Sequence, residues 1–334
     1  MIVAPYFEDF FVGQDFSDVP SVTVTEGLTA WHQSLFGDRN RLTLDQTLCE
    51  AVTNEPRMLV NPALVCNLAI GQSTIPSQRV LGNLFYRGLQ LLAPVFINDT
   101  LTTRTQVIGL KQNTIKPGRA ASGMVALEIQ VENQNGETVL HFWRCPMIPC
   151  RDPEADTGHN DDFAIMPEEI SDDQLLAHVP DWNFAAYRAR YPSASTPLFA
   201  EQTLVVEAAD TVTSAPELVR MTLNLAMTHT DATRSVYGRR LVYGGHTIAI
   251  ASKQMAMALP HIVQILAWYR CDHVGPVFEG DMLSSSIKIN KIIKVQDATI
   301  AKLVVEVFAK RGPEAPSELK DAQVLHWSLA VLLP

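Results

Sequence analysis

The sequence predicts an α+β chain made of two similar repeats, each an antiparallel sheet wrapped around one buried helix. The first observation is colinearity: five segments of the first half recur in the second half in the same order, at separations of 182 to 186 residues. Residues 139–141 and 324–326, both Val-Leu-His, match letter for letter. The second observation is that a long apolar helical segment precedes several strand-like runs. Short apolar matches arise by chance, but five in register indicate a tandem duplication.

The predicted elements follow one another in the same order within each repeat. A strand-like opening leads to a short helical stretch and then, in the second repeat, to an apolar helix over 245–259. Small or apolar residues occupy nearly every side of that helix, which predicts burial all round. Runs rich in β-branched residues predict strands. The predicted strands cover 21–25, 125–131, 203–207, 262–269, 282–289, 300–308 and 324–332.

An acidic segment separates the two repeats. Residues 151–174 hold nine acidic residues and one arginine, which accounts for most of the net charge of −10. Such a polar run is typical of a solvated linker. The sequence therefore predicts an N-terminal domain over 1–150, an acidic linker over 151–174 and a C-terminal domain over 175–334.

The composition indicates a cytoplasmic protein of two well-filled domains, with 47% apolar and 19% charged residues. No apolar run reaches the roughly 18 residues that span a bilayer, and the first residues lack the basic region of a signal peptide. The five cysteines are scattered without metal-ligand spacing, so we expect reduced thiols and no zinc. No basic surface indicates nucleic acid as a partner, and no membrane partner is expected.

A polar cluster in the second repeat carries the predicted chemistry. Asn224 and His229 lie five residues apart, ahead of a glycine turn at Gly244 that opens the apolar helix. An amide can orient a water molecule, and an imidazole can exchange a proton with it. A backbone N–H at a helix start can hold a developing negative charge. These are the groups needed to add water to an activated carbonyl compound, or to remove it.

The first repeat has an altered copy of this cluster. Asp38 stands at the place of the amide, Thr43 at the place of the histidine, and Pro62 at the place of the glycine. Proline has no backbone N–H to donate to an oxyanion, and threonine is no base. We therefore predict that the N-terminal half is non-catalytic and serves as a scaffold or as part of the substrate tunnel.

Several strings of the sequence resemble a known family. Residues 229–246 read HTDATRSVYGRRLVYGGH and residues 276–283 read PVFEGDML, while 6–14, 82–88 and 93–101 read YFEDFFVGQ, GNLFYRG and APVFINDTL. Over most of the chain these strings resemble the MaoC-like (R)-specific enoyl-CoA hydratases, and more closely the mesaconyl-CoA hydratases, also called β-methylmalyl-CoA dehydratases. The resemblance implies a double hotdog fold. It also implies a hydro-lyase that reversibly hydrates a short 2-enoyl-CoA thioester without a metal or redox cofactor.

Carried onto this chain, the resemblance gives the site residues their roles. It places the acid/base role on His229 and the binding of the thioester oxygen on the N–H of Gly244. The general family has Asp where this chain has Asn224, and the mesaconyl-type branch tolerates Asn there. The Asn and Pro of the general motif are here Ala226 and Met227, a departure in the part that holds the water.

Five further residues are candidates for substrate binding. Asp231, Tyr243 and Gly245 flank the motif. For a short acyl group that is branched or dicarboxylic, Arg79 and Arg87 beside GNLFY are the candidate partners of a carboxylate. Two alternatives stay open: a hotdog acyl-CoA thioesterase, and a dehydratase for carrier-bound or longer acyl chains. We expect an acyl-CoA as the binding partner, and the sequence leaves assembly into a homo-oligomer open.

Overall fold

The computed structural model describes residues 4–116, 118–312 and 320–334. In the first repeat, two short helices precede a buried helix, and four long strands follow it, as the duplicated pattern predicts. The elements are β1 (Val22–Thr23), α1 (Glu26–Phe36), α2 (Gln46–Thr53), α3 (Pro62–Gln72), β2 (Gly82–Leu91), β3 (Thr100–Gln112), β4 (Ser122–Glu132) and β5 (Thr138–Pro149), with 3-10 turns η1 (Phe7–Asp9) and η2 (Arg41–Thr43).

The second repeat follows the same plan. Its predicted helix and all of its predicted strands are present, with the long strands extending beyond the predicted bounds. The elements are α4 (Asp172–Ala177), α5 (Phe184–Arg190), η3 (Pro192–Ser195), β6 (Thr203–Val205), β7 (Asp210–Thr211), α6 (Ala215–Met221), η4 (Met227–His229), η5 (Ala232–Arg234), α7 (Gly244–Ala258), β8 (Gln264–His273), β9 (Met282–Val295), β10 (Ala298–Lys310) and β11 (Asp321–Leu333).

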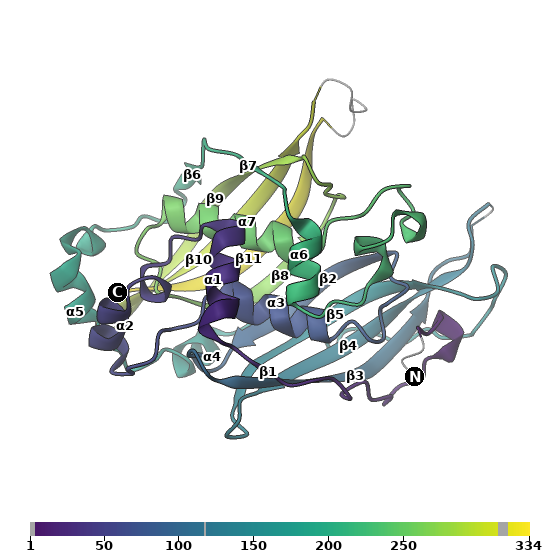
Figure 1. Cartoon of the computed structure of the whole chain (residues 1–334), viewed down its shortest axis with the longest axis horizontal. Helices are drawn as coiled ribbons and strands as arrows, with labels where there is room; N and C mark the ends of the chain where they lie inside the picture. The colour runs from purple at the N-terminus through teal and green to yellow at the C-terminus, as the bar shows by residue number, and fades with distance from the viewer. Residues whose placement is uncertain (1–3, 117, 313–319) are drawn as a thin grey trace.

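These strands form one 11-stranded sheet in which every pairing is antiparallel. The order is β1-β3-β4-β5-β2-β8-β11-β10-β9-β6, with β7 also paired to β9. Read from its two ends, this order puts equivalent strands of the two repeats at equivalent places. The duplication in the sequence therefore appears in the α+β fold as two halves with the same strand order, counted from the two ends of the sheet. The helices α3 and α7 lie across the middle of the sheet (Figure 1).

The two central helices begin differently, although they occupy equivalent places. Asn61 caps α3, its side chain accepting from the N–H of Ala63, and Pro62 supplies the first helical residue. Every residue of α3 is buried, which explains why its sequence has no polar face. Tyr243 stands at the equivalent N-cap of α7 but provides no side-chain cap. The first N–H groups of α7 therefore lack a side-chain acceptor.

The same buried turn recurs in each repeat and fixes the alignment of the two halves. Asp99 accepts a hydrogen bond from the Phe96 N–H at 2.8 Å, and Asp281 accepts one from the Phe278 N–H at 2.9 Å. Each carboxylate also pairs with an arginine at 2.7 Å. Because the equivalent residues are 182 apart, the start of α3 corresponds to the start of α7.

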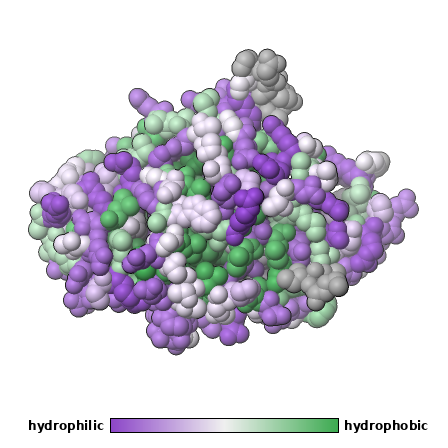
Figure 2. Space-filling model, viewed as in Figure 1, coloured by the Kyte–Doolittle hydropathy of each residue, from purple (hydrophilic) through white to green (hydrophobic). Residues whose placement is uncertain are grey.

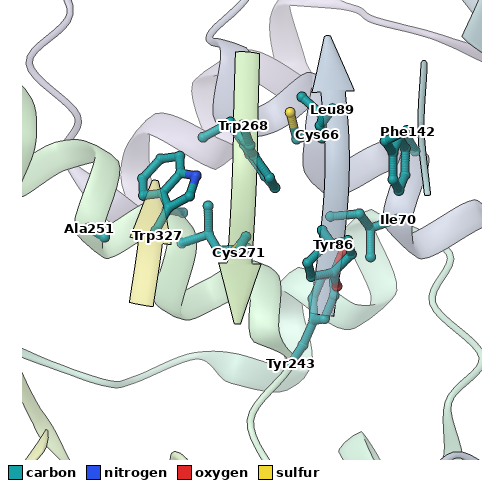
Figure 3. Packing of buried hydrophobic residues seen from close by; sticks show 14 of the residues in the cluster. Cys66, Ile70, Tyr86, Leu89, Phe142, Tyr243, Ala251, Trp268, Cys271 and Trp327 are labelled. Carbon is teal, nitrogen blue, oxygen red and sulfur yellow. The ribbon is translucent and has the colours of Figure 1, made fainter. Parts of the chain in front are cut away.

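The repeats join where β2 pairs with β8. The register places Tyr86 opposite Cys271 and Leu89 opposite Trp268. The rings of Tyr86 and Trp268 meet edge to face with centroids 6.1 Å apart, and Trp268 meets Trp327 at 5.2 Å. Figure 3 shows these buried side chains on adjacent strands, with Tyr243 pointing toward Tyr86. A continuous apolar core therefore runs across the boundary between the repeats.

The acidic segment 151–174 is more structured than the solvated linker that its composition predicts. The side chain of Asp161 accepts from the Leu110 N–H at 2.8 Å, and Asn160 forms a β-bridge with Lys111. Met166 and Ile170 are buried. The segment is thus tied to β3 of the first repeat by residues 160 and 161, while Ile170 packs in a cluster with residues such as Tyr269 of the second repeat. The division of the chain at residues 150 and 175 stays a prediction.

The surface is mixed in polarity. Figure 2 shows mainly hydrophilic residues around the outline of this face, and apolar residues toward its middle, where the helices lie against the sheet. Within the described ranges, no helix has the length and apolar character needed to cross a membrane.

Buried neutral histidines predict a loss of stability in acid. Burial lowers the pKa of His32 to about 3 and that of His246 to about 4, whereas an unfolded histidine titrates near 6.5. Between pH 6.5 and 4 the unfolded chain therefore binds protons that the folded chain does not, so stability falls as the pH falls. At pH 5 each histidine should cost about 1–2 kcal/mol relative to pH 7.5, measured by urea unfolding.

His32→Leu separates this effect from the titration of carboxylates. The Nε2 atom of His32 is buried without a hydrogen-bond partner among the described residues, and its ring packs on Phe36. The variant should lose less stability than the wild type between pH 7.5 and 5. An identical loss in both proteins would show that His32 is not a source of the acid sensitivity.

Candidate active site

A cavity of about 260 Å³ lies where the two repeats meet, and both repeats supply its walls. The first repeat contributes residues from the end of α3 and from β2 and β5, and the second contributes the predicted motif and the start of α7. The lining residues are Ile70, Thr74, Ser77, Val80, Leu81, Gly82, Asn83, Leu84, Tyr86, Arg144, Met147, Asn224, Ala226, Thr228, His229, Tyr237, Leu241, Val242, Tyr243, Gly244, Thr247, His273, Val274, Gly275, Pro276 and Val277.

His229 is held in one tautomer at the wall of this cavity. Its Nδ1 lies 2.8 Å from the carbonyl oxygen of Leu241, which can only accept, so Nδ1 carries the proton. Nε2 is then the unprotonated nitrogen. Burial lowers the pKa of His229 to about 4, against the opposing effect of the bond to Leu241. The imidazole is therefore neutral near pH 7 and can accept a proton at Nε2.

Gly244 brings the uncapped end of α7 into the same cavity. A Cβ built on Gly244 would lie 2.5 Å from Nε2 of His273, so only glycine permits this close packing. The neighbouring Gly245 is equally constrained, because its Cβ would lie 2.0 Å from Oδ1 of Asn67 on α3. The free N–H groups and the positive end of the helix dipole favour a negative charge at this point.

Asn224 also lines the cavity, but part of its amide is already used. Its Oδ1 accepts from the Ala226 N–H at 2.9 Å, which shapes the turn that leads to His229. The Nδ2 amine is the group left to contact a bound water. The amide therefore offers a donor to the water oxygen, and proton removal falls to His229.

The equivalent place in the first repeat is almost filled. Two small cavities of about 10 Å³ and about 30 Å³ adjoin Asn61, the first lined also by Asp38 and Pro62 and the second by Thr43. The carboxyl of Asp38 is buried, and burial raises its pKa against several hydrogen bonds. A space near 10–15 Å³ holds at most one water, so this half has no room for a substrate.

The remaining predicted residues of the motif differ in their placement. Tyr243 lines the cavity, and its hydroxyl donates to the Asn67 carbonyl at 3.1 Å. Gly245 faces Asn67 in the helix packing and is not among the lining residues. Asp231 caps η5, accepting from the N–H and hydroxyl of Thr233. Asp231 therefore has a local structural contact outside this cavity.

The structure does not bring Arg79 or Arg87 to the cavity. Arg79 donates to the carbonyl of Ala4 at 3.1 Å and stacks on Tyr6. Arg87 is buried in the sheet, where its guanidinium pairs with Asp272 and with Glu168. Arg87 follows the lining residue Tyr86 on β2 and points to the opposite face, because successive residues of a strand alternate. Arg79 lies in the turn before β2, where it contacts the N-terminal segment.

Arg144 and His273 also line the cavity, and the sequence analysis did not single them out. Arg144 on β5 is 2% exposed and lies in the wall of the cavity. His273 ends β8, and burial lowers its pKa to about 4. The available signal was alternation: Arg144 stands two residues after buried Phe142 and therefore on the buried face of its strand. No group of three or more potential metal ligands is found within the described ranges.

Solved structures define the class of protein. A conserved hypothetical protein from Mycobacterium tuberculosis, described as a double hotdog fold, is 42% identical, covers 98% of each chain and superposes with a TM-score of 0.87. A structure from Chloroflexus aurantiacus described as a MaoC domain protein dehydratase is 25% identical, covers 100% of this chain and 98% of its own, and gives a TM-score of 0.88. The chain belongs to the double hotdog family, and it is similar to MaoC-like dehydratases within it.

Curated relatives narrow the comparison. The β-methylmalyl-CoA dehydratase of Chloroflexus aurantiacus is 28% identical over 98% of this chain and 97% of its own length. The mesaconyl-CoA hydratase of Cereibacter sphaeroides is 28% identical over 92% of this chain and 90% of its own length. No protein-family model matches the chain.

The packing of Gly244 gives a prediction that requires no substrate. Gly244→Ala should displace the buried ring of His273 and cost about 1–3 kcal/mol of stability, as overpacking of a core does. Thermal unfolding and the imidazole NMR signals of His273 measure the two effects. Gly27→Ala in α1 is the control, because its Cβ would meet its nearest neighbour at an ordinary 3.8 Å. A Gly244→Ala protein with unchanged stability and His273 signals would refute the close contact.

Proposed function

We propose that this protein catalyses the reversible hydration of a short-chain 2-enoyl-CoA thioester, of the kind that converts mesaconyl-CoA to β-methylmalyl-CoA. The observation that carries the proposal is one cavity holding a neutral imidazole, His229, opposite an uncapped helix N-terminus at Gly244. The two curated relatives, which bear the names of this reaction in its two directions, support it.

The reaction needs a base and a place for negative charge. The oxygen of water bonds to Cβ, while Nε2 of His229 takes one of its protons. The electron pair of the C=C bond moves toward Cα and the thioester, which gives the carbonyl oxygen enolate character. The N–H of Gly244 and the dipole of α7 stabilise that oxygen. His229 then returns the proton to Cα, so that the sum is the addition of one water, and dehydration is the reverse.

The size of the cavity favours a small acyl group. Its volume of about 260 Å³ lies below the roughly 300–1,000 Å³ of common ligand pockets. Bulky side chains of the first repeat, including Ile70, Tyr86 and Met147, close the wall opposite the motif. The degenerate half thus limits the length of the acyl chain.

The conditions of action follow from the same residues. The mechanism uses only protein groups, so we propose that it requires no metal or redox cofactor. All five cysteines are buried and free, which suits a reducing cytoplasm. An acyl-CoA is the proposed binding partner.

A thioesterase and a carrier-dependent dehydratase are the alternatives, and one assay separates them from the proposal. Loss of the enoyl absorbance without release of free CoA identifies hydration, whereas release of a free thiol identifies a thioesterase. The values of kcat/KM for mesaconyl-CoA, crotonyl-CoA and dodecenoyl-CoA should be compared. The same acyl groups on pantetheine, which imitates the arm of a carrier protein, should be assayed beside them. Preference for the twelve-carbon substrate would overturn the short-chain assignment, and activity on carrier-bound substrates alone would favour the second alternative.

His229→Ala tests the assignment of catalysis to the second repeat. Removing the base should lower kcat/KM for hydration by about 100-fold or more. Thr43→Ala is the matched control at the equivalent place of the first repeat, and it should retain nearly full activity because its surroundings hold no substrate. Equal damage from the two substitutions would show that the halves are wrongly assigned.

A further inference from the structure

Arg144 is the one charged side chain among the described residues that line the cavity. The lining contains no aspartate, glutamate or lysine, and burial lowers the pKa of both His229 and His273 to about 4, so both are neutral near pH 7. The cavity therefore carries a formal charge of +1.

The guanidinium of Arg144 is only partly satisfied by the protein. Its Nη2 donates to the carbonyl oxygen of Ser73 at 2.5 Å and to Oγ of Ser77 at 2.8 Å. Its buried Nε has no hydrogen-bond partner, and no carboxylate within the described ranges pairs with it. Both partners are neutral oxygens, so the positive charge remains uncompensated.

The fold does not need an arginine at this place. The register pairs Arg144 with Tyr86 in the first repeat, and the equivalent pair in the second repeat is Leu329 with Trp268. Leu329 is fully buried. The same sheet therefore accepts leucine where the first repeat has an unpaired cation. A buried cation costs several kcal/mol unless an anion compensates it, so a structural role alone does not account for Arg144.

We propose that Arg144 binds the distal carboxylate of a dicarboxylic acyl group, and so selects such substrates over uncharged ones. This inference rests on the proposed function, since it names the acyl class that the hydratase site accepts. A carboxylate that enters the cavity meets a positively charged guanidinium whose Nη1 donates to none of the described residues, so the carboxylate can accept charge-assisted hydrogen bonds from that nitrogen. The two serines hold Nη2 and so orient the guanidinium. In this arrangement the first repeat binds the distal carboxylate of the acyl group, and the second repeat supplies the groups that react at the alkene next to the thioester.

The test compares two substrates that differ only at the distal group. Mesaconyl-CoA and tiglyl-CoA, (E)-2-methylbut-2-enoyl-CoA, share the branched alkene, and a carboxylate in the first replaces a methyl group in the second. The measured quantity is the ratio of kcat/KM for mesaconyl-CoA to that for tiglyl-CoA. The wild type should favour mesaconyl-CoA, and Arg144→Leu should lower the ratio by about 100-fold or more, as loss of a buried charged partner does.

Three variants make the ratio specific to the charge. Arg144→Leu carries the residue that the second repeat tolerates at the equivalent place. Arg144→Lys keeps the charge but not the planar guanidinium that the serines orient, so its ratio should lie between those of the wild type and Arg144→Leu. Arg79→Met removes an arginine that contacts Ala4 and Tyr6 instead of the cavity, and its ratio should equal that of the wild type. Because the ratio is taken on one protein sample, partial unfolding of a variant lowers both rates and leaves it unchanged.

Binding of saturated thioesters separates this inference from the proposed function. Succinyl-CoA and butyryl-CoA cannot be hydrated, and their dissociation constants can be measured by calorimetry. If the wild type hydrates neither alkene, the proposed function fails, while tighter binding of succinyl-CoA that is lost in Arg144→Leu still supports the carboxylate site. The proposed function stands and the role of Arg144 is overturned by either of two results. One is a wild type with equal kcat/KM for tiglyl-CoA and mesaconyl-CoA, and the other is an Arg144→Leu variant that keeps the wild-type ratio.

Discussion

The pairing of β2 with β8 is the contact on which the rest of the structure depends. It joins the five strands of the first repeat to the six strands of the second in a single sheet. At this junction Tyr86 lies opposite Cys271, and Leu89 lies opposite Trp268. Without this seam each half would expose an edge strand and an apolar face. The seam also sets α3 beside α7, and the contact of Gly245 with Asn67 requires that closeness. The cavity lies at this junction, so neither repeat could form it alone.

Divergence of the repeats follows from this shared cavity. Once α3 begins with a capping asparagine and a proline, it no longer offers free N–H groups, and its own site shrinks to spaces of about 10 Å³ and about 30 Å³. The side chains of the first repeat are then free to serve the remaining site, because Tyr86 and Arg144 reach it across the seam. Under the proposed function, the loss of free N–H groups in one half and the use of its side chains as a wall of the other site belong together. This accounts for a degenerate repeat that keeps a full core.

The sequence predicted the fold and part of the site, for reasons that can be stated. The repeat offsets and the all-round apolar helix were sufficient to predict antiparallel strands wrapped around buried helices, although not that the strands of both repeats join in one sheet. The spacing of Asn224, His229 and Gly244 located the candidate motif, because all three lie in the connection between α6 and α7. Arg144 was not predicted, since its place depends on the register of β5 against β2, which short-range patterns do not determine. Arg79 and Arg87 lie outside the cavity because their contacts with Ala4, Tyr6, Asp272 and Glu168 are long-range ones that sequence proximity does not predict. The acidic segment was misread because its buried Met166 and Ile170 are sparse among charged neighbours.

The low pKa of His229 is consistent with its proposed role as a base once the charge of the transition state is included. A resting pKa of about 4 keeps the imidazole unprotonated across the physiological range, although a base this weak would remove a proton from free water poorly. As the enolate oxygen forms at Gly244, its negative charge favours the imidazolium and raises the pKa of His229 during the reaction. The proton is therefore accepted only when the substrate can supply a counter-charge. On a dicarboxylic substrate the distal carboxylate would repel the incoming water oxygen, and pairing with Arg144 would remove much of that repulsion. Under this proposal the unpaired arginine acts on the rate as well as on selection.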